Sequence, residues 1–166
     1  MGMTGEYVRL TAAELDRALG DPEWARDRVG ELAEAADAEE RPVPEPRLHS
    51  TEKTWHALDF LLRRRAFPVD IVFGEEDLPG AAEWGHGPPR YLTPDRVRQA
   101  AEALAALTPE ALDKGVNPAD LTAAEIYPHI WERGDTLDWV TAEYQELARF
   151  FRIAARYRQA VVIWIG

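Results

Sequence analysis

Residues 84–94, WGHGPPRYLTP, constrain the fold of this chain more than any other segment. The glycines on either side of His86 permit positive φ, so its imidazole can be presented on a tight turn, and the two prolines that follow stiffen the backbone. Thr93 is a favoured N-cap residue, and Pro94 suits the first position of a helix. The segment therefore predicts an irregular loop, a short strand at residues 90–92 and a helix that starts at Pro94.

The polar side chains of this segment are candidates for anion binding. The free amides and the positive dipole at the start of a helix attract negative charge, and Arg90 is placed to add a bidentate guanidinium contact beside His86. The alternative is purely structural: Arg90 pairs with an acidic residue among 75–77, and Tyr91 fills the core. No GxGxxG sequence opens a helix and no GK[ST] sequence occurs, so the segment is not a phosphate-binding fingerprint.

Hydrophobic periodicity and capping signals predict seven helices. Thr11 and Glu14 have the spacing of a capping box, and Pro22 follows Asp21 at the start of the next helix. Residues 41–50 contain three prolines and are expected to form an extended connector. The expected helices cover residues 11–19, 21–38, 51–65, 94–107, 109–114, 118–131 and 137–158.

Runs of β-branched and aromatic residues predict four strands, at residues 3–10, 69–73, 90–92 and 160–165. These strands are widely separated, and strands and helices do not alternate in a βαβ rhythm. We therefore expect an α+β fold, a helix-rich single domain over residues 1–166 with a small mixed sheet. The last strand, AVVIWI, is placed inside the sheet, because an exposed edge of this composition would invite aggregation.

The composition excludes several classes of function. The chain has 166 residues, no cysteine and a net charge of −11. Without cysteine it has no disulfide, no thiolate catalysis, no zinc–thiolate site and no iron–sulfur cluster. The negative charge argues against partners such as nucleic acid and anionic membranes, whose binding relies on lysine and arginine.

The same sequence predicts a soluble cytoplasmic protein. Glu6 and Arg9 stand where a signal peptide needs an apolar run. The longest strongly apolar stretch, residues 160–165, is far shorter than the roughly 20 residues that span a bilayer. The abundance of alanine, proline and arginine is typical of a high-GC bacterial genome.

The helix expected over residues 51–65 carries a polar arc beside a tryptophan. His56 could act as a general base held by Asp59, or the two could be metal ligands. The simpler interpretation is a solvated ladder, since Glu52 with His56 and Asp59 with Arg63 both have i,i+4 spacing with the acid first.

Residues 124–132, AEIYPHIWE, pose a similar choice. In one continuous helix, Glu125, His129 and Glu132 would line one face at a spacing that suits a metal ion. Pro128 interferes with that helix, because it removes one backbone hydrogen bond and pushes Tyr127 away from α geometry. Tyr127 and Trp131 are then core aromatics, and we predict neither a metal nor a cofactor.

The segments KTWHALDFLL, GHGPPRYLTP and AEIYPHIW, with the opening GMTGEYVRLTAAEL and the terminal AVVIWIG, resemble the bacterial YfbM-like family, a domain of unknown function. The similarity covers nearly the whole chain in the order of the family. It implies a single-domain α+β fold of the YfbM-like type and no known reaction, substrate or cofactor. Family members often carry a histidine where this chain has Asp59, which weakens any proposal that needs two imidazoles on that helix.

These observations favour a non-enzymatic binding or protein-interaction domain. The partner would be a protein or a small anionic ligand held beside His86 and Arg90, and an acidic chain suits a basic protein partner. The alternative is a hydrolase or transferase acting on an anionic small molecule, with His56 or His86 moving protons. A helix face that stays apolar in the monomer would imply a homodimer. The residues expected to line the pocket are Trp55, His56, His86, Arg90, Tyr91, Glu125, Tyr127 and His129.

Overall fold

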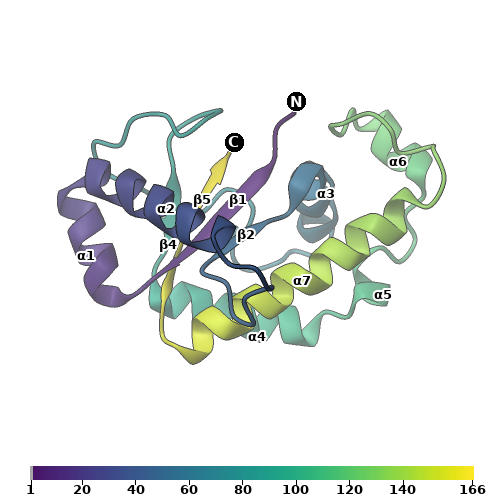
Figure 1. Cartoon of the computed structure of the whole chain (residues 1–166). Coiled ribbons are helices and arrows are strands. Elements are labelled where there is room, and N and C mark those ends of the chain that lie inside the picture. Colours follow the sequence, from purple (N-terminus) through teal and green to yellow (C-terminus); the bar gives the residue numbers. More distant parts are fainter. Residues whose placement is uncertain (1) are drawn as a thin grey trace.

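The computed structural model describes residues 2–166 and places a five-stranded sheet between two groups of helices (Figure 1). The strand order is β2-β1-β5-β4-β3, and every described pair is antiparallel. The α+β class is confirmed, but the sheet is antiparallel and not mixed as the sequence predicted, because no described pair of strands is parallel. The strands are β1 Gly5–Leu10, β2 Leu48–Ser50, β3 Glu76–Asp77, β4 Arg90–Leu92 and β5 Ala160–Ile165.

The helices that cover the sheet follow the sequence signals closely at their starts. Thr11 forms the expected capping box with Glu14, and Thr93 accepts a hydrogen bond from the amide of Arg96. The helices are α1 Ala12–Gly20, α2 Pro22–Asp37, α3 Trp55–Arg64, α4 Pro94–Ala106, α5 Pro109–Leu112, α6 Pro118–Ala123 and α7 Thr136–Arg156, and a 3-10 turn, η1, covers Glu52–Thr54. Within residues 2–166, none of these helices is both long enough and apolar enough to cross a membrane.

Strand β5 lies at the centre of the sheet, as its apolar sequence predicted. It pairs with β1 on one side and with β4 on the other, so Ile163 lies opposite both Tyr7 and Arg90. Successive side chains of a strand point to opposite faces. Accordingly Ile163 joins the larger core and Val162 the smaller one.

Each face of the sheet is covered by a different group of helices (Figure 1). The larger core lies on the face covered by α3, α4 and α7, and α7 contributes the stripe of Val140, Tyr144, Leu147 and Phe151 that its periodicity predicted. The smaller core lies beneath the α1–α2 pair, which covers Val8 and Val162. Helix α2 buries only Ala25 among its 16 residues, so most of its surface stays open.

The strand expected at residues 69–73 is wrong. Val69, Ile71 and Val72 are buried as an apolar run should be, but the backbone turns. The Oδ1 atom of Asp70 accepts hydrogen bonds from the amides of Val72 and Phe73, at 3.2 and 2.9 Å. These hydrogen bonds from backbone amides to the Asp70 side chain stabilise a turn and compete with strand pairing. The buried hydroxyl of Tyr7 also binds this turn, because it donates to the carbonyl of Ile71 at 2.7 Å.

The helix expected over residues 118–131 ends at Ala123. Beyond it Glu125 and His129 adopt positive φ, 54° and 64°, and the Tyr127–Pro128 peptide bond is cis. A second expected helix, over residues 51–65, begins instead as the 3-10 turn before continuing as α3. The buried indole of Trp131 donates to the carbonyl of Ile126 at 2.7 Å, so the loop folds back on itself where the sequence pattern allowed a continuous helix.

Candidate functional site

The eight residues predicted to form a pocket separate into two groups. His86 and Arg90 line one hollow at the end of β5, while Trp55, His56 and Tyr127 form an aromatic stack beside α3. Of the remaining three, Tyr91 packs into the smaller core on the opposite face of the sheet. Glu125 and His129 are exposed on the loop after α6, the same loop that carries Tyr127.

The hollow at His86 and Arg90 has a volume of about 280 Å³. Its apolar lining comes from the end of the central strand and from the buried turn after α3, and the exposed Pro88 adds to it from the loop. Its rim is polar, with the exposed imidazole of His86, the guanidinium of Arg90 and the carboxylate of Asp77. The remaining lining residues are Val72, Phe73, Gly87, Ile163, Trp164 and Ile165. We call this space the His86–Arg90 hollow.

The glycines of the loop hold His86 at the rim. The amide of His86 donates to the carbonyl of Ile165 at 2.8 Å, so the loop continues the sheet by one hydrogen bond. Gly85 has φ 123°, and a Cβ atom there would lie 2.6 Å from the carbonyl oxygen of Ile165. Gly87 has φ 122° and would meet nothing within 4 Å. Both positions therefore need glycine for their backbone conformation, and Gly85 needs it for space as well.

Arg90 is anchored to its own chain. Its Nη2 atom donates to the carbonyl of Glu75 at 2.8 Å, its Nε atom lies 3.4 Å from the carbonyl of Gly74, and its Nη1 atom bonds Asp77 at 2.8 Å. The backbone contacts fix the guanidinium. The Asp77 side chain is 75% exposed, so this ion pair contributes little to stability and can be exchanged at low cost.

The start of helix α4 does not face this hollow. Its Thr93 oxygen caps the amide of Arg96, and Arg96 in turn bonds both carboxylate oxygens of Glu75, at 2.7 and 2.8 Å. The hydrogen bonding from Arg96 is the main cause of the lowered pKa of Glu75. Pro94 lines a different hollow. An anion held jointly by Arg90 and the helix start is therefore not supported by the arrangement.

The aromatic stack on α3 is closed by the protein itself. The ring of Trp55 stacks on His56 at 5.1 Å and on Tyr127 at 5.8 Å between ring centroids. The N-terminal segment covers it, because the indole of Trp55 donates to the carbonyl of Met3 at 3.0 Å and the Tyr127 hydroxyl accepts from the amide of Met3 at 2.9 Å. Phe73 contacts Trp55 edge-on at 6.0 Å and also lines the His86–Arg90 hollow, so it joins the two groups.

The hydrogen bonding of His56 defines its tautomer. Its Nδ1 atom accepts the amide hydrogen of Tyr127 at 2.9 Å, so the neutral ring carries its proton on Nε2. Partial burial is the main cause of a lowered pKa at His56. The negative charge of Asp59 raises this pKa, and the positive charge of His129 lowers it further. The neutral form is thus favoured, and its only basic nitrogen is occupied by a backbone amide. His56 holds the loop after α6 and is poorly suited to accept a proton from a substrate.

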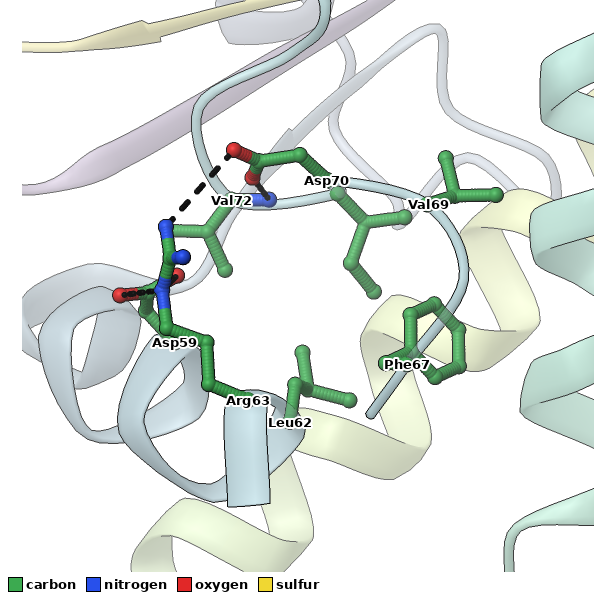
Figure 2. Close-up of a pocket in the computed structure, with 8 residues that line it drawn as sticks. Asp59, Leu62, Arg63, Phe67, Val69, Asp70 and Val72 are labelled. Atoms are coloured by element: carbon green, nitrogen blue, oxygen red, sulfur yellow. Dashed lines mark hydrogen bonds and ion pairs between the residues drawn. The ribbon is translucent and has the colours of Figure 1, made fainter. Parts of the chain in front are cut away.

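Of the two i,i+4 pairs that the sequence predicted on the polar arc of α3, the pair of Asp59 and Arg63 is present. The Nε atom of Arg63 bonds both oxygens of Asp59, at 2.9 and 2.8 Å, and its Nη2 atom lies 4.0 Å from Asp70. Figure 2 shows these side chains on the rim of a hollow of about 90 Å³, with Phe67 and Val69 across from them. The charged groups of this hollow pair with each other, so we assign it a structural role: its side chains connect α3 to the turn that follows.

The loop after α6 presents no assembled metal site. Glu125 and His129 are both exposed, and across residues 2–166 no group of three histidine, aspartate or glutamate side chains is positioned to hold a metal ion.

Sequence reasoning missed the apolar lining of the His86–Arg90 hollow and one buried charge. Ile163, Ile165 and Phe73 were assigned to strands, and their sequence gives no signal that they border a cavity. Arg9 is 3% exposed and donates to the carbonyls of Glu45 and Pro46. Its position two residues after the core residue Tyr7, on the same strand face, is the signal that could have identified it.

Comparisons with known proteins place the chain by family and fold. A family model described as "Domain of unknown function (DUF1877)" matches residues 1–164. The solved structure of YfbM from Escherichia coli, a protein of unknown function, is similar with a TM-score of 0.68 at 17% sequence identity, over 98% of this chain and 99% of that chain. No curated protein matches the chain.

Proposed function

We propose that this chain, which belongs to the DUF1877 family, is a non-enzymatic binding domain whose ligand site is the His86–Arg90 hollow. The observation that carries the proposal is the joint placement of an imidazole and a guanidinium on the rim of a hollow with an apolar lining. An apolar cavity with a few convergent polar groups is the usual form of a small-molecule site, and a volume of about 280 Å³ is near the lower end of the usual range.

The chemistry of the hollow favours a small ligand with an apolar body and one carboxylate. The body would rest on Ile163, Ile165 and Phe73, and the carboxylate would replace Asp77 on the free side of Arg90. The exchange is cheap because Asp77 is exposed, while the two carbonyl contacts keep Arg90 in place. The net charge of −11 repels anions in general, so the affinity would depend on this local cation.

The arrangement supports the enzymatic alternative less well. His56, His86 and Arg90 would have to converge on one reacting molecule, but His56 lies in the covered aromatic stack and its Nδ1 atom is bound to the amide of Tyr127. His86 is left without a charged orienting partner among the described ion pairs. A general base is normally held by such a partner, so binding without chemistry is favoured.

The proposal is tested by titrating ¹⁵N-labelled protein with phenylacetate and with phenylethanol, which has the same apolar body and no charge. We expect phenylacetate to shift the amide resonances of His86, Gly87 and Arg90, and phenylethanol to bind more weakly. Arg90→Met should abolish the phenylacetate shifts. Asp77→Asn should tighten binding by roughly two- to fivefold, because the competing carboxylate is removed from an exposed pair.

The matched control is Arg98→Met, which removes an arginine from another exposed ion pair, with Glu102. This variant should bind phenylacetate like the wild type. Equal loss in both arginine variants, or resonances in the hollow that no phenylacetate concentration moves, would refute the proposed ligand site.

A further inference from the structure

The end of strand β5 that borders the His86–Arg90 hollow carries a backbone amide without a partner. Two hydrogen bonds between Thr4 and Gly166, at 2.7 and 2.8 Å, fix which residues of β5 face β1. Because bonded and non-bonded pairs alternate along an antiparallel ladder, the amide and the carbonyl of Ile165 point away from β1 and toward β4. The carbonyl accepts from the amide of His86 at 2.8 Å, whereas the amide of Ile165 donates no hydrogen bond within residues 2–166.

The loop opposite Ile165 explains why its amide is free. Arg90 lies opposite Ile163, so a regular ladder would place Pro88 opposite Ile165. Proline has no amide hydrogen, and the donor to the carbonyl of Ile165 is instead His86, which lies two residues before Pro88. The loop therefore has extra residues between its last two contacts with β5, and it bulges away from the strand there.

The His86–Arg90 hollow lies along this bulge. Its lining includes Gly87 and Pro88 of the loop and residues 163–165 of the strand that faces them. The free amide of Ile165 points between these two walls and is a hydrogen-bond donor at the hollow. A ligand that covers this amide without accepting its hydrogen leaves a polar group unsatisfied, whereas a ligand carbonyl placed there gains a hydrogen bond.

The amide of Ile165 and the guanidinium of Arg90 are two polar anchors that suit the end of a peptide chain. Arg90 lies opposite Ile163, two residues from Ile165, which corresponds to roughly 6.6 Å along the strand. An extended peptide covers the same length with about two residues. A carbonyl just before a terminal carboxylate can therefore accept from the amide of Ile165 while the carboxylate meets Arg90. The volume of about 280 Å³ is small for a ligand site and suits a single residue, so the rest of the peptide stays outside.

We propose that the ligand of the His86–Arg90 hollow is the carboxyl-terminal residue of a peptide or protein, with an apolar side chain. The inference rests on the function proposed above and adds a third recognised group, the carbonyl that precedes the terminal residue. The carboxylate binds Arg90, the carbonyl accepts from the amide of Ile165, and the side chain packs on Ile163 and Phe73. A simple carboxylic acid with the same apolar body makes only the first and the last of these contacts.

The test compares N-acetyl-L-phenylalanine with 3-phenylpropionate, which has the same phenyl body and carboxylate but no acylamino group. In titrations of ¹⁵N-labelled protein, we expect N-acetylphenylalanine to bind roughly two- to tenfold more tightly, which is the gain of one hydrogen bond. It should also slow the solvent exchange of the Ile165 amide, whereas 3-phenylpropionate should leave that rate unchanged. The peptide acetyl-glycyl-glycyl-phenylalanine has the same last residue and should bind at least as tightly as N-acetylphenylalanine.

A pair of variants at position 165 separates the amide from the side chain. Ile165→Pro removes the amide hydrogen at a position where no hydrogen bond of the sheet uses it. This variant should bind N-acetylphenylalanine no more tightly than 3-phenylpropionate. The matched variant Ile165→Val keeps the amide, so it should weaken both ligands alike and preserve the preference for N-acetylphenylalanine. The comparison of the two ligands on the wild type decides the matter even where Ile165→Pro fails to fold.

Equal affinity of the wild type for the two compounds, with no change in the exchange of the Ile165 amide, would overturn this inference and leave the ligand site itself in place. Binding of neither compound in the hollow would refute the ligand site as well. Tighter binding of N-acetylphenylalanine together with rejection of the peptide would also overturn the inference, because the ligand would then be a free N-acyl amino acid.

Discussion

His49 on β2 makes the stability of this protein depend on pH in a range where most carboxylates are already charged. Its ring stacks on Phe150 at 5.3 Å and tilts against Tyr7 at 6.0 Å, and its Nε2 atom is buried without a hydrogen-bond partner. Burial lowers the pKa of His49 from 6.5 to about 4. Glu146 and Arg149 of α7 border the adjoining hollow, but burial is the dominant cause of the shift.

The magnitude follows from linkage. Between pH 6.5 and about 4, His49 is protonated in the unfolded chain and neutral in the folded chain. The free energy of unfolding therefore falls as pH falls. The full difference is on the order of 3 kcal/mol, since one pKa unit corresponds to about 1.4 kcal/mol. From pH 7 to 4.5 the His49 contribution amounts to a loss of about 2 kcal/mol. Above pH 6.5 the stabilisation is fully present.

His49→Phe keeps the ring on Phe150 and removes both the proton and the unpartnered nitrogen. At pH 7 we expect it to match or exceed the wild type in stability, because a buried polar atom without a partner costs roughly 1–3 kcal/mol. The assay is urea unfolding at pH 7 and pH 4.5, and the wild type should lose about 2 kcal/mol more than the variant. Contributions from other groups, including His56, cancel in this difference.

Parallel stability curves for wild type and His49→Phe across this range would refute the argument. They would mean that the folded protein accepts the proton as readily as the unfolded chain, and that the ring is solvated.

Two further predictions concern the sites described above. In thermal or urea unfolding, Gly85→Ala should lower the free energy of unfolding by about 3 kcal/mol or more, and Gly87→Ala by about 1–2 kcal/mol. Both glycines have positive φ, but only at Gly85 would a Cβ atom meet the carbonyl of Ile165. Equal losses in the two variants would exclude the steric contribution. Tyr127→Phe should cost about 1 kcal/mol through the lost hydrogen bond to the amide of Met3, with faster hydrogen exchange at that amide; unchanged exchange would contradict the contact.

The candidate site was only partly predictable from the sequence. The glycines around His86 indicated a presented imidazole, and His86 and Arg90 do share a hollow. The sequence also left open that Arg90 pairs with one of the acidic residues at 75–77, and it bonds Asp77. The apolar lining was not predictable, because Ile163 and Phe73 come together only through the strand order and the turn after α3.

The sequence by itself determined those features that depend on interactions between residues close together in the chain, or on the apolar character of one segment. Thr11 and Thr93 begin helices because their hydroxyls satisfy amides three residues away, and the apolar run of β5 had to be buried between other strands. Only the tertiary structure decided that residues 69–73 turn. The same apolar run satisfies either conformation, and the choice follows from the carboxylate of Asp70 and the distant hydroxyl of Tyr7, which bind its backbone groups.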